Sequence, residues 1–427
     1  MQRISASFYV ANVKAFKTQM LNWCGRFSIC CFMDSHNYED KYHKYDCLVA
    51  VESYKSFPPG DDALHQLDVF CKENNDWIFG HLGYDLKNKI ENLESTHSNK
   101  IDFEDIFFFV PKVVLSLKNN WLTIHSLAKK PQLIFDEINV EAAQINSTSV
   151  KQNIQLASVI TKQEYIEIIQ KLQQHILRGD CYEINYCQEF FAEDIVIDPL
   201  LSYKKLLEIS PTPFSCFYKL ENKYLLCASP ERFLSKINNT IFSQPIKGTA
   251  ARNTDVKLDD LEKENLYQSK KEKSENVMIV DLVRNDLSKI CKEGSVEAEE
   301  LFGIYSFPQV HQMISTVKGE LKEGISFAEI IQATFPMGSM TGAPKLKAMQ
   351  LIEQYEKTKR QLFSGTVGYI SPGKDFDFNV VIRSIFYNEA NKYLNYLVGG
   401  AITFYADAEK EFEECMLKSR AIKEALQ

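Results

Sequence analysis

The stretch KYLLCASPERFLSKINNTIFSQPIKGT, residues 223–249, decides between the two main classes of mixed fold. Strand-like runs follow one another within it, separated by turns that contain proline, glycine or asparagine. Two further strand-like runs precede it, CYEINYCQEFF (181–191) and FSCFYKL (214–220). Because strands and helices do not alternate strictly, the pattern favours an α+β fold with mostly antiparallel sheets over a doubly wound parallel sheet.

The first part of the chain combines strand-like runs with one helical segment. The runs are FSICCFMD (27–34), YDCLVAVES (45–53) and IFFFVPKVVLSL (106–117). The spacing of apolar residues from Asp62 to about Asn75 predicts a helix between them.

Helix signals recur in the second part. Thr161 and Glu164 form a capping box, and Gly179 predicts the end of the helix that they begin. A long helical stretch is predicted over 259–287, and the chain closes with a helix from about Glu409.

A polar segment separates the two parts. EINVEAAQINSTSVKQNIQLAS (137–158) has only weak periodicity and is the best candidate for a linker. We therefore expect an N-terminal region over about 1–150 and a second region over 160–427.

Composition narrows the functional class. The chain of 427 residues is 45% hydrophobic and 25% charged, which is ordinary for a globular protein. Its net charge of -8 gives no sign of the excess of basic residues that is typical of proteins that bind nucleic acid or an anionic membrane. No apolar run approaches the roughly 20 residues that cross a bilayer, and the N-terminus lacks the features of a secretory signal.

The cysteines point to a reducing compartment. There are 11, an odd number, and none forms a CxxC pair. We therefore expect mostly buried, inert thiols in a cytoplasmic protein rather than disulfides or a zinc site.

Two acidic pairs are candidates for a metal site. Glu272 and Glu275 lie three residues apart on one predicted helix, and Glu411 and Glu414 lie three apart on another. Four carboxylates brought together would repel one another unless a hard cation such as Mg²⁺ bound among them. From spacing alone, two solvated acidic faces remain the alternative.

The candidate cationic residues are ambiguous taken singly. Lys247 between Pro-Ile and Gly-Thr could be an exposed loop lysine or an amine placed at a substrate. Arg383 lies in DFNVVIRS, which reads as one alternating strand, and suits a carboxylate clamp or plain exposure. Tyr369 is equally ambiguous, and Lys418 could simply pair with Glu414 four residues earlier.

Together these stretches resemble one family, the chorismate-utilising enzymes. The resemblance is strong over about residues 160–427. Before that it is faint, and GYDLKN (83–88) is the main similar segment. The matching segments occur in the family's order: ASPERF (228–233), PIKGTAAR (245–252), ENVMIVDLVRNDL (275–287), MGSMTGAPKLKAM (337–349), FSGTVGYI (363–370), DFNVVIRSI (377–385), GGAIT (399–403) and EFEECMLKSRAI (411–422).

The resemblance implies a fold and a reaction. The fold would be that of anthranilate synthase component I, with mostly antiparallel sheets packed face to face and flanked by helices. Several members carry alanine at the position of Lys247, whereas a lysine resembles the aminodeoxychorismate synthase branch. In that branch a lysine attacks C2 of chorismate and expels the C4 hydroxyl, and ammonia then attacks C4 of the covalent intermediate.

The resemblance also implies roles around this lysine. Glu231 would be the general acid that protonates the departing hydroxyl, which requires a raised pKa. Members that add water use a lysine as general base where this chain has Glu183, so the water-activating amine is missing.

For the metal and the substrate, the resemblance assigns two further sets of residues. Glu275 and Glu414 would bind Mg²⁺, supported through water by Glu272 and Glu411, and the ion would meet the ring carboxylate of chorismate. The expected substrate-binding positions are Thr249, Tyr369, Arg383, Gly399, Gly400 and Lys418.

The chain departs from the family pattern at two positions. Gln312 replaces a common histidine that assists pyruvate elimination in anthranilate synthase, although His311 is adjacent. This fits an enzyme that stops at aminodeoxychorismate. Asn276 replaces another common histidine, with no derived consequence.

Partners follow from what the sequence lacks. No cysteine lies in the nucleophile turn of a glutamine amidotransferase, so we expect ammonia from a separate amidotransferase subunit. The chain ends at Gln427 without room for a fused lyase, so aminodeoxychorismate would pass to another enzyme for para-aminobenzoate and folate synthesis. Whether the N-terminal region binds tryptophan is left open.

Two rival functions remain. One is anthranilate synthase component I, which Lys247 and Gln312 disfavour. The other is a non-catalytic chorismate- or tryptophan-binding regulator, which the intact set of Lys247, Glu231, Glu275 and Glu414 disfavours.

Overall fold

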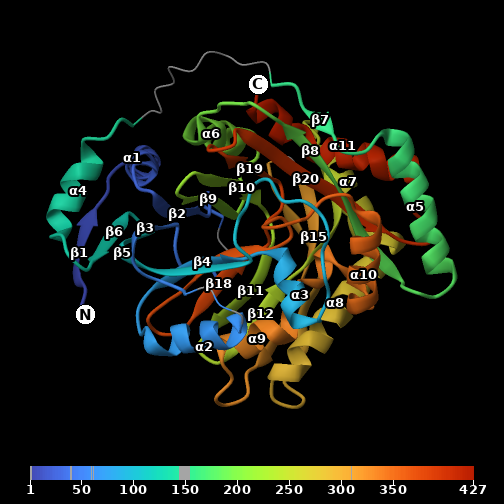
Figure 1. The fold of residues 1–427 in the computed structure, drawn as a ribbon, viewed down its shortest axis with the longest axis horizontal. Helices are drawn as coiled ribbons and strands as arrows, with labels where there is room; N and C mark the ends of the chain where they lie inside the picture. Colours follow the sequence, from blue (N-terminus) through green and yellow to red (C-terminus); the bar gives the residue numbers. More distant parts are fainter. Residues whose placement is uncertain (1, 39–40, 59, 61, 144–153, 309) are drawn as a thin grey trace.

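A computed structural model describes residues 2–38, 41–58, 60, 62–143, 154–308 and 310–427. Helices and strands are mixed along the chain, and every named pair of strands in the described residues is antiparallel. The predicted α+β class is therefore confirmed, and Figure 1 shows helices around the outside of the strands.

One continuous run of strands forms the first layer. In hydrogen-bonding order it comprises β7 (Ala157–Ser158), β8 (Glu183–Ala192), β20 (Tyr393–Ile402), β19 (Ser384–Asn388), β10 (Lys223–Ser229), β9 (Phe214–Leu220), β2 (Ile29–Asp34), β3 (Cys47–Ser56), β5 (Ile106–Lys118), β6 (Trp121–Ser126) and β1 (Ile4–Tyr9). The strands from 181–249 that suggested the fold class thus pair with strands from both ends of the chain.

A second layer grows from the beginning of β5. Residues 106–109 of β5 pair with β4, while its later residues pair with β6, so this long strand belongs to both layers. The second layer comprises β4 (Ile78–Leu82), β17 (Thr366–Ile370), β18 (Phe376–Asn379), β11 (Arg232–Ile237), β12 (Thr240–Gln244) and β15 (Val310–Glu320), with β13 (Ile246–Ala251) and β14 (Glu297–Ser306) also paired to β15.

The main core lies between the two layers. Cys31 of β2 and Tyr218 of β9 join a buried cluster with Phe233 of β11 and Phe378 of β18. The neighbouring residue Cys30 points the other way, into a second cluster beneath the helices. Because successive strand residues face opposite sides, this division confirms the face-to-face packing.

Helices cover the outer faces. Those that matter below are α5 (Lys162–Leu177), α7 (Val256–Gln268), α8 (Lys270–Ile290), α9 (Phe327–Thr334), α10 (Lys345–Tyr355) and α11 (Ala408–Ala425). The others are α1 (Val13–Gly25), α2 (Ala63–Glu73), α3 (Lys87–Ile90), α4 (Pro131–Asn139) and α6 (Pro199–Ile209), with short 3-10 turns at η1 (Tyr84–Leu86) and η2 (Gly338–Met340).

Local capping chemistry explains why several predicted helices are correct. The side chain of Asp62 accepts the backbone N–H of His65 at the start of α2. At α5 both halves of the capping box between Thr161 and Glu164 are present, and Gly179 follows the helix with a φ of +81°. The C-terminal helix is also confirmed as α11.

Two predicted elements are wrong in detail. The single helix expected over 259–287 is two, because Ser269 adopts an extended backbone and its side chain caps α8 through the N–H of Glu272. The strand expected to run through DFNVVIRS stops at Asn379, since Val380–Ile382 closes a tight backbone turn and Arg383 takes a φ of +51°.

The two ends of the predicted linker belong to regular elements. Its first residues belong to α4 and its last two form β7, while residues 144–153 lie outside the described part of the chain. The division at about residue 150 stays a prediction. Strand pairs β2–β9 and β4–β17 join the two proposed regions in the same layers.

Two expectations from composition can be checked in the coordinates. All 11 cysteines are free and buried, as expected for inert thiols. Across the described ranges, no helix combines the length and the apolar character needed to cross a bilayer.

Candidate active site

Lys247 is not an exposed loop lysine. It lies in β13 with 9% of its surface exposed, and its Nζ donates a hydrogen bond of 2.6 Å to Oε1 of Glu183. Glu183 begins β8 and is 1% exposed. The structure therefore places the two residues that stood out in the sequence, 64 positions apart, in one buried ion pair.

Two glycines allow the backbone to approach this pair closely. Gly248 has a φ of +100°, and a Cβ there would lie 3.1 Å from a carboxylate oxygen of Glu272. Gly342 has a φ of +140°, and a Cβ there would lie 2.2 Å from the carbonyl oxygen of Glu183. The PIKGT and MGSMTGAP segments therefore need these glycines to reach the site.

Glu231 lies in the loop between β10 and β11 and is 4% exposed. Burial raises its pKa to about 7, opposed by the hydroxyl of Ser339 and by the charges of Lys247 and Arg383. A small cavity of about 20 Å³, room for a water molecule, adjoins Glu231 and Ser339. A carboxyl group with this pKa is still partly protonated at neutral pH, as a general acid requires.

The two acidic pairs lie on two different helices near Lys247. Glu272 and Glu275 come from the first turns of α8, and Glu411 and Glu414 come from the first half of α11. The charge of Lys247 acts on all four carboxyl groups. Sequence spacing therefore predicted the pairs correctly, and tertiary packing brings them around one lysine.

This arrangement suits a cation. Burial, together with repulsion between neighbouring carboxylates, raises the pKa of Glu275 and of Glu411 to about 7. Among the described residues, no three His, Cys, Asp or Glu side chains lie close enough to enclose a metal ion by themselves. Mg²⁺ needs no such cage, because it usually takes one or two carboxylates and completes its shell with waters and substrate oxygens.

Arg383 lies in the connection between β18 and β19, close enough to the site for its carboxyl groups to act on it. Glu231 and Glu414 are the charged groups that act on it, while burial lowers its pKa. Within the described residues its guanidinium makes no hydrogen bond or ion pair, so its donors are available to a ligand carboxylate. The positive φ of Arg383, which sequence alternation missed, sets this orientation.

The remaining substrate-binding candidates differ in position. Lys418 does pair with Glu414, at 2.7 Å, and also donates to the carbonyl oxygen of Gly399. A Cβ on Gly400 would lie 3.0 Å from Glu411. Thr249 is exposed on β13, opposite Gln312 in the ladder. Lys418 and the two glycines therefore lie beside the carboxylates of α11.

Tyr369 lies in a different environment. It is buried in an aromatic cluster with Tyr45, Trp77 and Phe79, with ring centroids about 6 Å apart. Burial raises the pKa of its phenol, and the charge of Asp377 adds to the effect. The structure thus gives Tyr369 a packing role between β17 and the N-terminal strands, and none of these contacts brings it to the lysine.

The two departures from the family pattern are buried next to the site. Gln312 is 2% exposed, and its side-chain oxygen has no hydrogen-bond partner in the described structure. His311 points to the opposite side of β15, where Asp259 and Ser306 bind its two ring nitrogens. His311 therefore does not substitute for the missing histidine. Asn276 accepts a hydrogen bond from Ser315.

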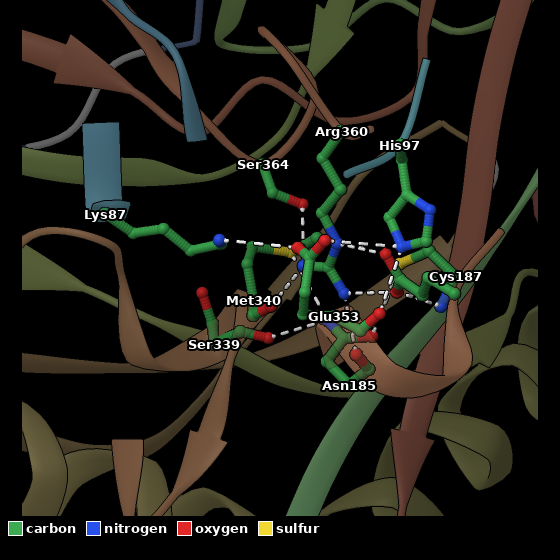
Figure 2. A network of polar contacts seen from close by, with 10 residues as sticks. Lys87, His97, Asn185, Cys187, Ser339, Met340, Glu353, Arg360 and Ser364 are labelled. Carbon is green, nitrogen blue, oxygen red and sulfur yellow. Dashed lines mark hydrogen bonds and ion pairs between the residues drawn. The ribbon is translucent and has the colours of Figure 1, made fainter. Parts of the chain in front are cut away.

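A buried polar network links Arg360 to Asn185 of β8 and to the η2 turn (Figure 2). Arg360 forms two hydrogen bonds with Glu356, of 2.6 and 2.9 Å, and donates to the carbonyl oxygens of Met340 and Asn185. The side chain of Asn185 in turn donates to the carbonyl oxygen of Ser339. The network therefore fixes the start of β8, which carries Glu183, against the η2 turn.

The N-terminal GYDLKN segment joins the same network. The guanidinium of Arg360 lies 4.6 Å from the ring centroid of Tyr84, and Lys87 lies 3.6 Å from Glu353. Asp85 accepts the backbone N–H of Gln361. The one N-terminal motif found in the sequence thus contributes to the scaffold of the site.

Sequence reasoning missed three contributors. Lys271 lies 3.9 Å from Glu275 and acts on all four carboxyl groups of the two acidic pairs. Ser339 lies beside Glu231, and Arg360 anchors the turn that carries Ser339. The spacing of Lys271 and Glu275, four apart on one helix, was the only local signal available.

Two relatives of known name are similar to this chain in sequence. The component 1 of aminodeoxychorismate synthase from Escherichia coli (strain K12) is 32% identical over 397 residues, covering 89% of this chain and 86% of that protein. The chloroplastic aminodeoxychorismate synthase of Arabidopsis thaliana is 34% identical over 370 residues, covering 80% of this chain. This chain spans only 39% of the length of that plant relative.

A solved structure shows the same fold. Anthranilate synthase component I from Streptococcus pneumoniae TIGR4 superimposes with a TM-score of 0.79 and 22% identity, covering 90% of this chain and 93% of that one. The family model described as chorismate binding enzyme matches residues 30–424. The chain therefore belongs to the family of chorismate binding enzymes.

Proposed function

We propose that this protein is the chorismate-aminating component of an aminodeoxychorismate synthase, which converts chorismate and ammonia to 4-amino-4-deoxychorismate. The observation that carries the proposal is Lys247 itself. Its amine is buried between Glu183 and Glu231, within the field of the four metal-site carboxylates. The aminodeoxychorismate synthases among the relatives support the choice of product.

Lys247 would act as the nucleophile. Its Nζ would bond to C2 of chorismate as the C4–O bond breaks, and Glu231 would protonate the departing hydroxyl so that it leaves as water. Ammonia would then attack C4 and release the lysine. Gln312 offers no proton to a later elimination of pyruvate, so the reaction would stop at aminodeoxychorismate.

The substrate carboxylates would be held by cations. Arg383 offers unpaired donors on the side of Glu231, and Lys418 and the backbone near Gly399 and Gly400 would bind opposite it. Glu275 and Glu414 would hold Mg²⁺, with Glu272 and Glu411 acting through water. The bound ion would offset the repulsion between a dianionic substrate and these carboxylates.

The wider setting is part of the proposal. A separate glutamine amidotransferase subunit would supply ammonia, which fits the printed name of the Escherichia coli relative as a component 1. The product would serve para-aminobenzoate and folate synthesis in the cytoplasm.

Product analysis tests the proposal directly. Purified protein is incubated with chorismate, Mg²⁺ and ammonium chloride. The products are separated by chromatography and identified by mass spectrometry. We expect aminodeoxychorismate from the wild type and none from Lys247→Ala. Fluorescent anthranilate as the sole product would assign the protein to the rival synthase, and no ammonia-dependent product at all would favour a non-catalytic binding protein.

A further inference from the structure

The pairing of Lys247 with Glu183 poses a chemical problem for the proposed reaction. Burial alone would favour the neutral amine, but the carboxylates around Lys247, above all Glu183, raise its pKa instead. The lysine is therefore an ammonium in the free protein. An ammonium has no lone pair, so its proton must leave before Nζ can attack carbon.

Acidic groups face the pair from three other elements, and the cations Lys271, Lys418 and Arg383 act in turn on those acidic groups. Glu231 approaches from the β10–β11 loop, Glu272 and Glu275 from α8, and Glu411 and Glu414 from α11. Glu231 carries its own proton to the leaving group, and the helical carboxylates lie at the proposed cation site. Of these acidic groups, Glu183 is the one joined to Nζ by a hydrogen bond in the described structure.

Glu183 also has an unused oxygen. Its Oε1 accepts the 2.6 Å hydrogen bond from Nζ of Lys247. Its Oε2 is buried and has no hydrogen-bond partner among the described residues. A purely structural buried carboxylate normally has both oxygens satisfied. Glu356 in the Arg360 network is such a case, because Oε1 and Oε2 both accept hydrogen bonds.

We propose that Glu183 is the base that removes the proton of Lys247 and holds it while the lysine is bonded to the substrate. This role rests on the proposed function and adds a catalytic residue to it. Transfer along the 2.6 Å hydrogen bond converts a buried ion pair into a neutral acid and amine. A site closed to water favours that neutral pair.

The proton count closes over the whole cycle. The Lys247 ammonium gives a proton to Glu183, Nζ bonds to C2, and the ring double bonds shift towards C4. The C4–O bond breaks with its electron pair on oxygen, which takes the proton of Glu231 and leaves as water. Ammonia then bonds to C4, and the electron pair of the C2–N bond returns to Nζ.

The same two carboxyl groups are then restored. Glu183 returns its stored proton to the released amine of Lys247. Glu231 takes a proton from the new ammonium at C4, which leaves the neutral amine of the product. The net reaction is chorismate plus ammonia to aminodeoxychorismate plus water, and no further oxidant, reductant or base is needed.

The test is the pH dependence of attack by Lys247. Chorismate and Mg²⁺ are mixed with the protein without ammonia, and the covalent adduct is followed by intact-protein mass spectrometry between pH 6 and 8.5. With Mg²⁺ held at a saturating concentration at each pH, so that protonation of Glu275 and Glu411 does not empty the metal site, we expect a flat rate below pH 7 in the wild type, because the proton passes within the pair. In Glu183→Gln we expect a slower rate that falls about tenfold for each pH unit towards acid.

Matched variants separate catalysis from folding. Glu189→Gln makes the same substitution on the same face of β8, where Tyr393 and Asn395 donate to the carboxylate, and should keep the wild-type profile. Glu183→Asp retains a carboxylate and should keep a flat limb at a reduced rate. A structural defect would lower the amount of active protein but would not create a new acid limb.

Each result decides the matter. Adduct formation by Glu183→Gln at the wild-type rate or faster, with a flat limb, would overturn the role of Glu183. Should that variant not fold, a wild-type rate that falls tenfold per unit below pH 7 at saturating Mg²⁺ would overturn it equally. For a short-lived adduct, the same limb is measured in kcat/KM for product formation.

Failure of the proposed function has a different signature. There the wild type forms no aminodeoxychorismate with ammonia at any pH. A wild type that makes aminodeoxychorismate beside a Glu183→Gln variant with a flat limb rejects only the proton transfer.

Discussion

Two buried charged clusters adjoin the start of β8, and they differ in how fully their charges are satisfied. Around Arg360, the guanidinium binds a carboxylate, two carbonyl oxygens and a hydroxyl, and both oxygens of Glu356 are occupied. Around Lys247, six carboxyl groups lie among the cations Lys247, Lys271, Lys418 and Arg383, and Oε2 of Glu183 has no hydrogen-bond partner among the described residues.

The difference separates scaffold from site. A buried charge with every hydrogen bond satisfied stabilises one arrangement of the chain. A buried cluster with excess charge of one sign is costly unless a ligand completes it. We therefore assign the Arg360 cluster to structure and the Lys247 cluster to binding and chemistry. Mutations in the Arg360 cluster should mainly lower stability, and mutations in the Lys247 cluster should mainly lower turnover.

The largest expected effect is on turnover in the Lys247 cluster. Lys247→Ala should lower kcat by at least about 1,000-fold, because it removes the nucleophile. Steady-state assay of product with ammonia and Mg²⁺ measures this, and circular dichroism verifies folding. Lys236→Ala is the matched control, since Lys236 on β11 pairs with Asp375, which directly precedes β18, and lies outside the cluster. A loss of less than tenfold would contradict the assignment.

In the Arg360 cluster the main effect should be on stability. Arg360→Met leaves Glu356 charged, buried and unpaired, so we expect a loss of about 3–5 kcal/mol in the free energy of unfolding. Urea denaturation followed by tryptophan fluorescence measures it. A change below about 1 kcal/mol would show that the cluster is not a scaffold, and the comparison would fail.

The third prediction concerns the pH dependence set by Glu231. Its pKa is raised to about 7, so the protonated, proton-donating form predominates below that pH and declines above it. We expect kcat to fall progressively above pH 7. Glu231→Gln should lower kcat by about 100-fold or more and remove this alkaline limb. An unchanged limb in that variant would assign it to another group.

The smallest predicted effect is on metal affinity. Chelation with EDTA should stop turnover, and added Mg²⁺ should restore it. Glu275→Gln should raise the Mg²⁺ concentration needed for half-maximal activity by about 10-fold or more, because it removes a charged ligand. Glu293→Gln, on the exposed turn after α8, is the control and should leave that concentration unchanged. Full activity in EDTA would refute the metal site.

Much of the fold follows from local sequence. The caps at Asp62 and Thr161 and the stop at Gly179 act over a few residues, so the helices they bound were predicted correctly. The break at Ser269 was missed because serine is tolerated inside a helix as well as at its cap. The strand through Arg383 was misread because alternation does not reveal a tight turn.

For the site as well, some features follow from the sequence and others only from the tertiary structure. The sequence by itself determined which chemical groups are present: the lysine in the PIKGT motif, the acidic pairs on two helices, and the family to which they belong. Only the tertiary structure decided that Glu183 meets Lys247, that the Arg383 guanidinium has no partner in the described part of the chain, and that Tyr369 packs among aromatic rings. The physical reason is distance along the chain. Caps and turns form between near neighbours, whereas a buried charge acquires its partners only when strands far apart in sequence assemble into layers.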